Sequence, residues 1–76
     1  MAHTTHSLGF DPVYWDDSYP IALLLKRAHP NVDPSEISHD DLHRRVIALE
    51  AFADDADVFL VERLEDIQVE WLEVIA

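Results

Sequence analysis

Three acids in the middle of the chain are the side chains best suited to bind a metal. Asp54, Asp55 and Asp57 fall within four residues, and carboxylate oxygens suit Ca²⁺, Mg²⁺ or Fe²⁺ in weak, water-rich sites. The segment contains no glycine, which an EF-hand loop requires at its sharp turn. We therefore predict at most loose binding of a divalent cation at these three carboxylates, and no cofactor that the protein requires.

Two histidines have the spacing of a helical metal site. His39 and His43 are four residues apart, which lets both rings point the same way from a helix. No glutamate stands between them as it does in metalloproteases, and the intervening Asp40 and Asp41 are better explained as acids in the first turn of a helix. We therefore predict that His43 is a half-buried, hydrogen-bonding residue in preference to a metal ligand.

A stripe of acids follows one face of the predicted C-terminal helix. It consists of Glu62, Asp66, Glu70 and Glu73, at positions i, i+4, i+8 and i+11. Like charges at this spacing destabilise a helix, and acids near its C-terminus oppose the helix dipole. A face selected only for solubility would mix signs. Two interpretations stay open: a surface that binds a basic partner, or an acidic surface set by a salt-rich cytoplasm.

The sequence offers no catalytic set. No nucleophile, base and oxyanion donor converge, and there is no glycine loop that would bind a phosphate. A chain of 76 residues is one domain at most and is too small for a deep cleft. Without cysteine it cannot carry a persulfide or ligate an iron–sulfur cluster through thiolates. We predict that the protein is not an enzyme.

The charge balance narrows the possible partners. The formal net charge is −11, from 16 acids and five bases. Binding to nucleic acid or to an anionic membrane needs clustered lysine and arginine, so the expected partner is a cation or a basic protein surface. No apolar run approaches the roughly 20 residues that span a bilayer, and the N-terminus has no basic region typical of a signal peptide. We expect a cytoplasmic protein.

The central helix is predicted from its apolar spacing. Leu42, Val46, Leu49 and Ala53 recur at i, i+4, i+7 and i+11, which is one stripe of an α-helix. Ser38 stands where an N-cap belongs, and Asp41 three residues later could return its hydrogen bond. The pattern predicts a core helix from residue 39 to residue 52, closed by the acidic turn.

Two further start signals precede this helix. Trp15 stands ahead of Asp17 and Ser18, either of which could cap a first helix that ends before Pro30. Trp15 is predicted to pack in the core in preference to stacking on a ligand. Asp33 is predicted to cap a short helical turn that starts at Pro34 and closes with a capping box.

The last helix has the longest periodic pattern and is predicted to run from Val58 to Ala76. Its apolar stripe consists of Leu60, Leu64, Ile67, Trp71 and Val74. We predict a mainly α protein with three main helices, a short helical turn and little or no β-structure, over residues 13–76. Residues 1–12 have no period and are predicted to form a flexible leader.

A series of motifs runs from Val13 to the end of the chain in a fixed order. They are Trp15-x-Asp17-Ser18 with Ile21, Ala28-x-Pro30-x-Val32-Asp33-Pro34, Asp41-Leu42-His43, Leu49-Glu50-x-Phe52-x-Asp54-Asp55, Leu64-Glu65-x-Ile67 and Trp71-Leu72. This set resembles the IscX family of small acidic proteins of bacterial iron–sulfur cluster assembly. The resemblance implies a winged-helix-like domain without DNA binding, an acidic face that docks on a cysteine desulfurase, weak binding of Fe²⁺ by surface carboxylates, and an adaptor or regulator role.

The resemblance also assigns residues. Together with the acidic stripe and His43, the acids that match the family give the predicted partner-binding set: Asp16, Asp17, Asp33, Asp40, Asp41, His43, Glu62, Asp66, Glu70 and Glu73. Where the family commonly has carboxylates on its first helix, this chain has Pro20, Leu23 and Arg27, so no iron site is expected there. Asp57 is expected to cap the last helix, and Phe59 is a candidate for added packing or for an exposed apolar contact.

Three functional hypotheses follow. The first is a monomeric adaptor that binds a cysteine desulfurase electrostatically and tunes cluster assembly. The second is a ferrous-ion carrier that uses the central carboxylates. The third, and the least favoured, is an acidic mimic of nucleic-acid charge that blocks a basic protein site.

Overall fold

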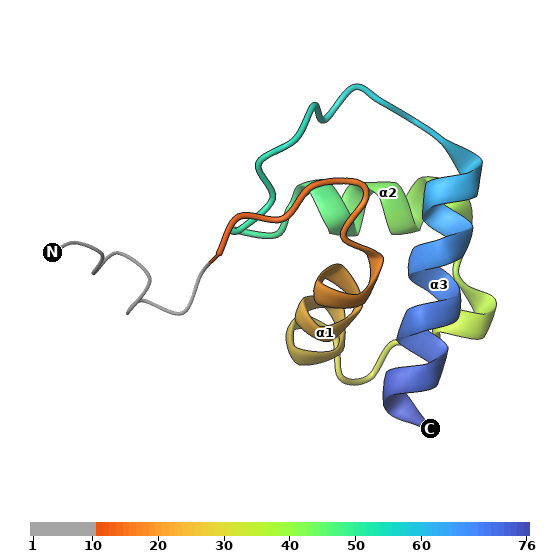
Figure 1. Ribbon diagram of the computed structural model, residues 1–76. Helices are drawn as coiled ribbons and strands as arrows, with labels where there is room; N and C mark the ends of the chain where they lie inside the picture. Colours follow the sequence, from red (N-terminus) through yellow and green to blue (C-terminus); the bar gives the residue numbers. More distant parts are fainter. Residues whose placement is uncertain (1–10) are drawn as a thin grey trace, which may run out of the picture.

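The computed structural model describes residues 11–76 and contains three α-helices and one 3-10 turn. These are α1 (Ser18–Ala28), η2 (Pro34–Glu36), α2 (His39–Ile47) and α3 (Val61–Ile75). Figure 1 shows α3 along one side of the molecule, with α1 beside it and the start of α2 near its upper half. Within residues 11–76 the only β-structure is one isolated bridge. The mainly α fold class is confirmed; the finer winged-helix likeness stays a prediction.

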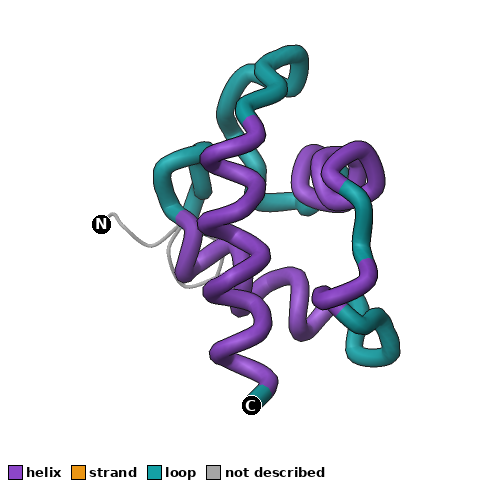
Figure 2. Tube along the Cα trace, turned by 90° about the vertical axis from the view of Figure 1, so that its right-hand side faces the viewer, coloured by secondary structure: helices purple, strands orange, loops and turns teal. Residues whose placement is uncertain are grey.

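The core forms where the apolar faces of the three helices meet. α1 contributes Ile21, Ala22 and Leu25, α2 contributes Leu42 and Val46, and α3 contributes Leu64, Ile67 and Trp71; Val13 and Trp15 complete the cluster. Trp15 is buried, as the sequence predicted. In the view of Figure 2, α3 stands in front of the other helices, so its outer face is open to solvent. The predicted leader, residues 1–12, lies almost entirely outside the described residues.

The prediction that α2 continues to residue 52 is wrong. The helix ends at Ile47, with Ala48 as its C-cap. The following turn brings the chain back to Val13, whose backbone accepts a hydrogen bond from Ala53 and donates one to Ala51, both at 2.9 Å. This pairing needs extended backbone, so the helix cannot continue. Leu49 still packs against the core, which is why its spacing resembled a helical stripe.

The predicted caps are confirmed in part. The Ser38 hydroxyl accepts a hydrogen bond from the Asp41 backbone N–H at 3.1 Å, as expected for the N-cap of α2. The Asp41 carboxylate, however, lies 3.3 Å from Arg45 and 3.7 Å from Arg44 instead of closing a capping box. Asp17 occupies the N-cap position of α1 without a cap hydrogen bond, because its carboxylate accepts one from the Tyr14 N–H at 2.9 Å.

The short turn η2 starts as predicted but closes differently. Asp33 is its N-cap and Pro34 its first residue. The Asp33 carboxylate accepts hydrogen bonds from the Ser35 N–H at 3.0 Å and the Ser35 hydroxyl at 2.7 Å. The backbone N–H of Ser35 therefore donates to the N-cap side chain, where a capping box would use the backbone N–H of Glu36. Gln68 on α3 donates to the Pro34 carbonyl at 2.7 Å, which fixes η2 against the last helix.

Helix α3 starts three residues later than its periodicity predicted, and Asp57 does not cap it. The N-cap is Leu60, whose apolar side chain cannot accept a hydrogen bond. The Asp57 N–H donates to the Asp55 carboxylate at 2.9 Å. Phe59 lies 5.2 Å from the His43 ring, between ring centroids, and is 43% exposed. Leu60 and Val61 are exposed beside it, so this helix start has neither a cap nor full burial.

Leu60→Asp is expected to stabilise the protein by about 1 kcal/mol. Leucine is among the poorest N-caps, and an aspartate there can accept a hydrogen bond from the first turn of α3; its charge also favours the positive helix end. Leu60 already has the extended backbone of an N-cap. The measurement is the urea midpoint at neutral pH, with Leu60→Asn as the uncharged control. A fall in midpoint for both variants would contradict the uncapped geometry.

Candidate docking surface

The outer face of α3 is rich in acids. Leu64, Ile67 and Trp71 bury the inner face of this helix. The stripe that the sequence predicted therefore faces away from the core. Its members are exposed at Glu62, Asp66 and Glu73 and half-buried at Glu70. Val69, in the same stretch, is 52% exposed and puts an apolar side chain among the acids.

One flank of this surface comes from the turn ahead of α1. Arg63 Nε lies 3.1 Å from Asp16 Oδ1, and Arg63 Nη1 lies 3.9 Å from Asp66 Oδ2. Asp16 itself is 81% exposed. The single arginine thus joins two acids that are 50 residues apart in sequence, and it leaves the region negative.

The other flank comes from the start of α2. His39 Nε2 lies 3.6 Å from Glu65 Oε2, and the exposed Asp40 follows His39 in the first turn of α2. We call the exposed acids of α3 and of its two flanks the α3 acidic surface; it consists of Asp16, Asp40, Glu62, Glu65, Asp66 and Glu73. The positive N-termini of α2 and α3 favour Asp40 and Glu62, which lie in the first turns of these helices, whereas Glu73 lies in the last turn of α3, where the helix dipole disfavours an acid.

Of the other four acids of the predicted partner-binding set, Glu70 is half-buried on α3 and three have structural partners. Asp17, Asp33 and Asp41 are engaged as described above, in a backbone turn, in a cap and in ion pairs. The sequence missed Glu65 and the linking role of Arg63. The i, i+3 spacing of Arg63 and Asp66 could have suggested their pair, but the contact with Asp16 depends on the tertiary fold.

His43 lies in an aromatic cluster. Its ring stacks on Trp15, with centroids 5.4 Å apart and an interplanar angle of 14°. Its Nε2 lies 3.0 Å from the Val58 carbonyl, and since a carbonyl can only accept, Nε2 carries the proton in this contact. Phe52 meets Trp15 edge to face at 4.9 Å. The predicted half-buried, hydrogen-bonding role of His43 is confirmed; its assignment as a partner-binding residue stays a prediction.

The central acids fasten Trp15 to the loop that follows α2. One Asp54 oxygen accepts from the Trp15 N–H at 2.9 Å, and the other accepts from the Asp55 N–H at 2.7 Å. The Trp15 indole donates to the Asp55 carbonyl at 2.9 Å. Within residues 11–76, no three histidine or acidic side chains are placed to hold a metal together. Loose metal binding by Asp54, Asp55 and Asp57 therefore stays a prediction, and Asp54 has a structural role.

The same contacts make the stability of the protein depend on pH in the acidic range. The hydrogen bonds from the backbone N–H groups of Trp15 and Asp55 hold the pKa of Asp54 below its ordinary value of 3.8. Because the folded pKa is the lower one, the stabilisation is complete above about pH 4 to 5 and is lost as the pH falls through the folded pKa. The pKa of Asp33 is lowered in the same way by Ser35, so two groups titrate in this window.

Asp54→Asn is expected to flatten the loss of stability between pH 5 and pH 2. The amide does not titrate, and its nitrogen cannot accept the hydrogen bond from Trp15. The measurement is the urea midpoint across that range, with Asp57→Asn as the control, because Asp57 is exposed and offers only its backbone N–H to the loop. An unchanged acid slope for Asp54→Asn would contradict this role.

Comparisons with known proteins extend these observations. Residues 13–76 match the family model described as "Iron-sulphur cluster assembly". An uncharacterized protein of Pseudomonas aeruginosa is 39% identical over 59 residues, which cover 78% of this chain and 89% of that protein. Among residues 11–76, no helix is long and apolar enough to cross a membrane. With the match covering all three helices and the acidic surface, the chain belongs to the iron–sulphur cluster assembly family, the family of the IscX proteins that its motifs resemble.

Proposed function

We propose that the protein is a non-catalytic adaptor or regulator of iron–sulfur cluster assembly that docks its α3 acidic surface on a basic surface of a cysteine desulfurase. The observation that carries the proposal is the gathering of six exposed or solvent-facing acids around α3, with Arg63 paired among them. The family match supports the process. The absence of cysteine from the sequence means that persulfide sulfur would stay on the partner.

Electrostatic complementarity would govern this interaction. Exposed charges of one sign speed the encounter with an oppositely charged surface and fix its orientation. Val69 would add an apolar contact that the rim of acids surrounds, which is the usual anatomy of a protein interface. In this proposal the protein acts as a monomer in the cytoplasm, where its partner is found.

The experiment is a titration of the full chain with its cognate cysteine desulfurase at two salt concentrations. Raising the ionic strength from about 0.01 M to about 0.15 M shortens the screening length from about 30 Å to about 8 Å. Binding is expected at low salt and should weaken steeply at the higher one. Absent binding, or affinity that does not change with salt, would contradict the proposal.

Loose binding of Fe²⁺ is a separate part of the proposal and would use Asp54, Asp55 and Asp57. The support is their position on one exposed loop, although Asp54 already accepts two backbone hydrogen bonds. An anaerobic Fe²⁺ titration followed by NMR is expected to give weak, saturable shifts confined to this loop. Uniform shifts over all acids would show only counter-ion accumulation and would remove the carrier hypothesis.

A further inference from the structure

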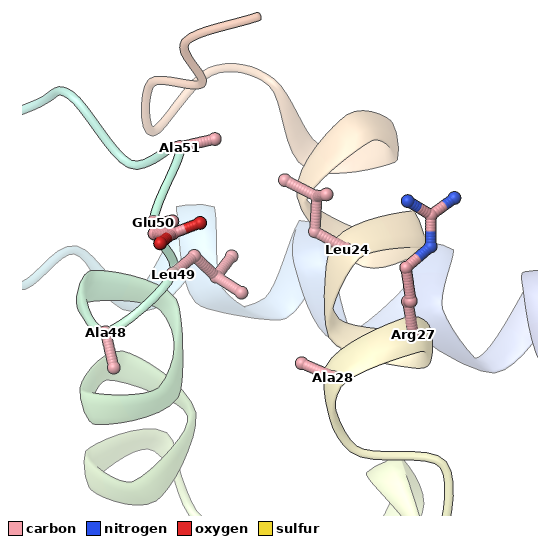
Figure 3. A pocket seen from close by; sticks show the side chains of 7 residues that line it. All are labelled: Leu24, Arg27, Ala28, Ala48, Leu49, Glu50 and Ala51. Atoms are coloured by element: carbon pink, nitrogen blue, oxygen red, sulfur yellow. The ribbon is translucent and has the colours of Figure 1, made fainter. Parts of the chain in front are cut away.

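A groove lies between α1 and the turn that follows α2. It has a volume of about 330 Å³ and is lined by Leu24, Arg27, Ala28, Ala48, Leu49, Glu50 and Ala51. Figure 3 shows Leu24 and Ala28 on the α1 side, facing Leu49 and Ala48 across the gap, while α3 passes behind α1. The floor of the groove is therefore apolar. In this view it opens away from α3.

The lysine and arginine residues beside this groove differ from the other bases in having no acidic partner among residues 11–76. Arg44, Arg45 and Arg63 each lie within 4 Å of an aspartate. Lys26 and Arg27 have no ion pair with any of residues 11–76, although the sequence contains 16 acids. They are adjacent, exposed, and located at the end of α1 beside the groove. Among residues 11–76, the two lysine or arginine residues without an ion pair therefore lie next to each other.

Arg27 stands between two hollows. Besides the groove, it lines a second hollow with Leu23, Lys26 and Pro30. Leu23 is exposed, so apolar surface lies on both sides of the guanidinium group. The C-terminal dipole of α1 favours bases at these positions, but it accounts neither for their lack of acidic partners nor for the apolar surface around them.

We propose that this groove binds a short segment of a partner protein that carries an apolar side chain next to a single carboxylate. The apolar side chain would lie between Leu24 and Leu49, and the carboxylate would accept hydrogen bonds from Arg27, with Lys26 nearby. A guanidinium group matches a carboxylate with two parallel hydrogen bonds. The volume is at the lower end of the range for ligand sites, which suits one side chain and its neighbours.

Charge limits the class of segment. Glu50 lies across the gap from α1, whereas the Arg27 side chain projects from the other edge of α1 in this view, so Glu50 would repel a second carboxylate placed inside the gap. The net charge of −11 opposes the approach of a strongly acidic chain. The attraction is local to Lys26 and Arg27, so the segment carries its acid on the α1 side only. This surface is separate from the α3 acidic surface, and the inference does not depend on binding to a desulfurase.

The test is an NMR titration of the full ¹⁵N-labelled chain with the probe peptide acetyl-Ser-Leu-Leu-Asp-Ser-amide. Shifts are expected at residues 24–28 and 48–51, saturating at a Kd of about 1 mM or below. The same peptide with asparagine in place of aspartate is expected to bind about tenfold more weakly, because the charge-assisted hydrogen bonds to Arg27 are lost. A peptide with serines in place of both leucines is expected not to bind.

Variants of the protein sharpen the test. Arg27→Gln is expected to weaken binding of the probe peptide about tenfold. Arg27→Lys is expected to weaken it less, because lysine keeps the positive charge but cannot donate two parallel hydrogen bonds to the carboxylate. Ala48→Phe, at an exposed position, is expected to fill the groove and abolish binding. The matched control is Arg44→Gln, an exposed base elsewhere, which should leave the affinity unchanged.

Three results would overturn the inference. The first is no saturable shift up to about 10 mM peptide. The second is equal affinity for the aspartate and asparagine peptides. The third is a concentration-dependent shift of the groove residues without peptide, which would mean that a second copy of the chain covers this face.

Discussion

Replacing Glu62, Asp66 and Glu73 together by their amides is expected to weaken binding to the cognate cysteine desulfurase about tenfold at low salt. Each exposed charge pair contributes about 0.2 to 1 kcal/mol, so three losses amount to about 0.6 to 3 kcal/mol, a range that includes the 1.4 kcal/mol corresponding to a factor of ten. The three side chains are exposed on the outer face of α3, so the substitutions remove charge without touching the core.

The triple variant is expected to stay folded. Removing repulsion between like charges at i, i+4 stabilises a helix slightly, so its thermal midpoint should equal or exceed that of the wild type. The matched control changes Glu36, Glu50 and Asp57 to amides, which alters the net charge equally at exposed positions outside the α3 acidic surface. If the control weakened binding as much as the triple variant, net charge alone would explain the interaction and the docking surface would be misplaced.

Trp71→Ala is expected to cost about 3 to 5 kcal/mol of the free energy of unfolding, the usual loss for a buried tryptophan. Trp71 is 1% exposed and lies in the core between α3 and α1. A domain of this size has about 4 to 11 kcal/mol of stability in total. The variant should therefore be partly or fully unfolded at 37 °C. The measurement is urea unfolding followed by far-ultraviolet circular dichroism.

Two controls separate burial from helix propensity in that experiment. Trp71→Phe keeps most of the apolar volume and should lose less stability than the alanine variant. Val69→Ala, two residues away on the same helix but 52% exposed, should change stability by about 0.5 kcal/mol or less. A Trp71→Ala variant within about 1 kcal/mol of the wild type would contradict the packing described here.

Local signals in the sequence predicted most of the fold. The caps at Ser38 and Asp33 act over a few residues, and both are present. The end of α2 could not be predicted in this way. Leu49 keeps the helical spacing because it is half-buried, while the backbone just after it, at Ala51 and Ala53, pairs with the distant Val13. The apolar periodicity indicates which residues are buried. Here the helix ends at Ala48, although Leu49 beyond it still packs against the core.

The candidate site, too, could be predicted from the sequence only where it depends on local spacing. The acidic stripe of α3 follows from spacing within one helix, so it was predictable. The flanks required tertiary contacts, namely Asp16 with Arg63 and His39 with Glu65, which no local pattern encodes. The groove beside Arg27 is likewise formed by two segments that are 20 or more residues apart in sequence. The sequence predicts loose metal binding at Asp54, Asp55 and Asp57, whereas the hydrogen bonds that join Asp54 and Asp55 to Trp15 depend on the tertiary fold.

The most direct test of the docking account is an NMR map of the ¹⁵N-labelled protein bound to its cognate cysteine desulfurase at low salt. The account predicts that signals broaden first at Asp16, Asp40 and the outward positions of α3, and that the broadening disappears on adding salt or in the triple amide variant. Broadening confined to the groove around Arg27, or no broadening at all, would contradict the claim that the α3 acidic surface is the docking site.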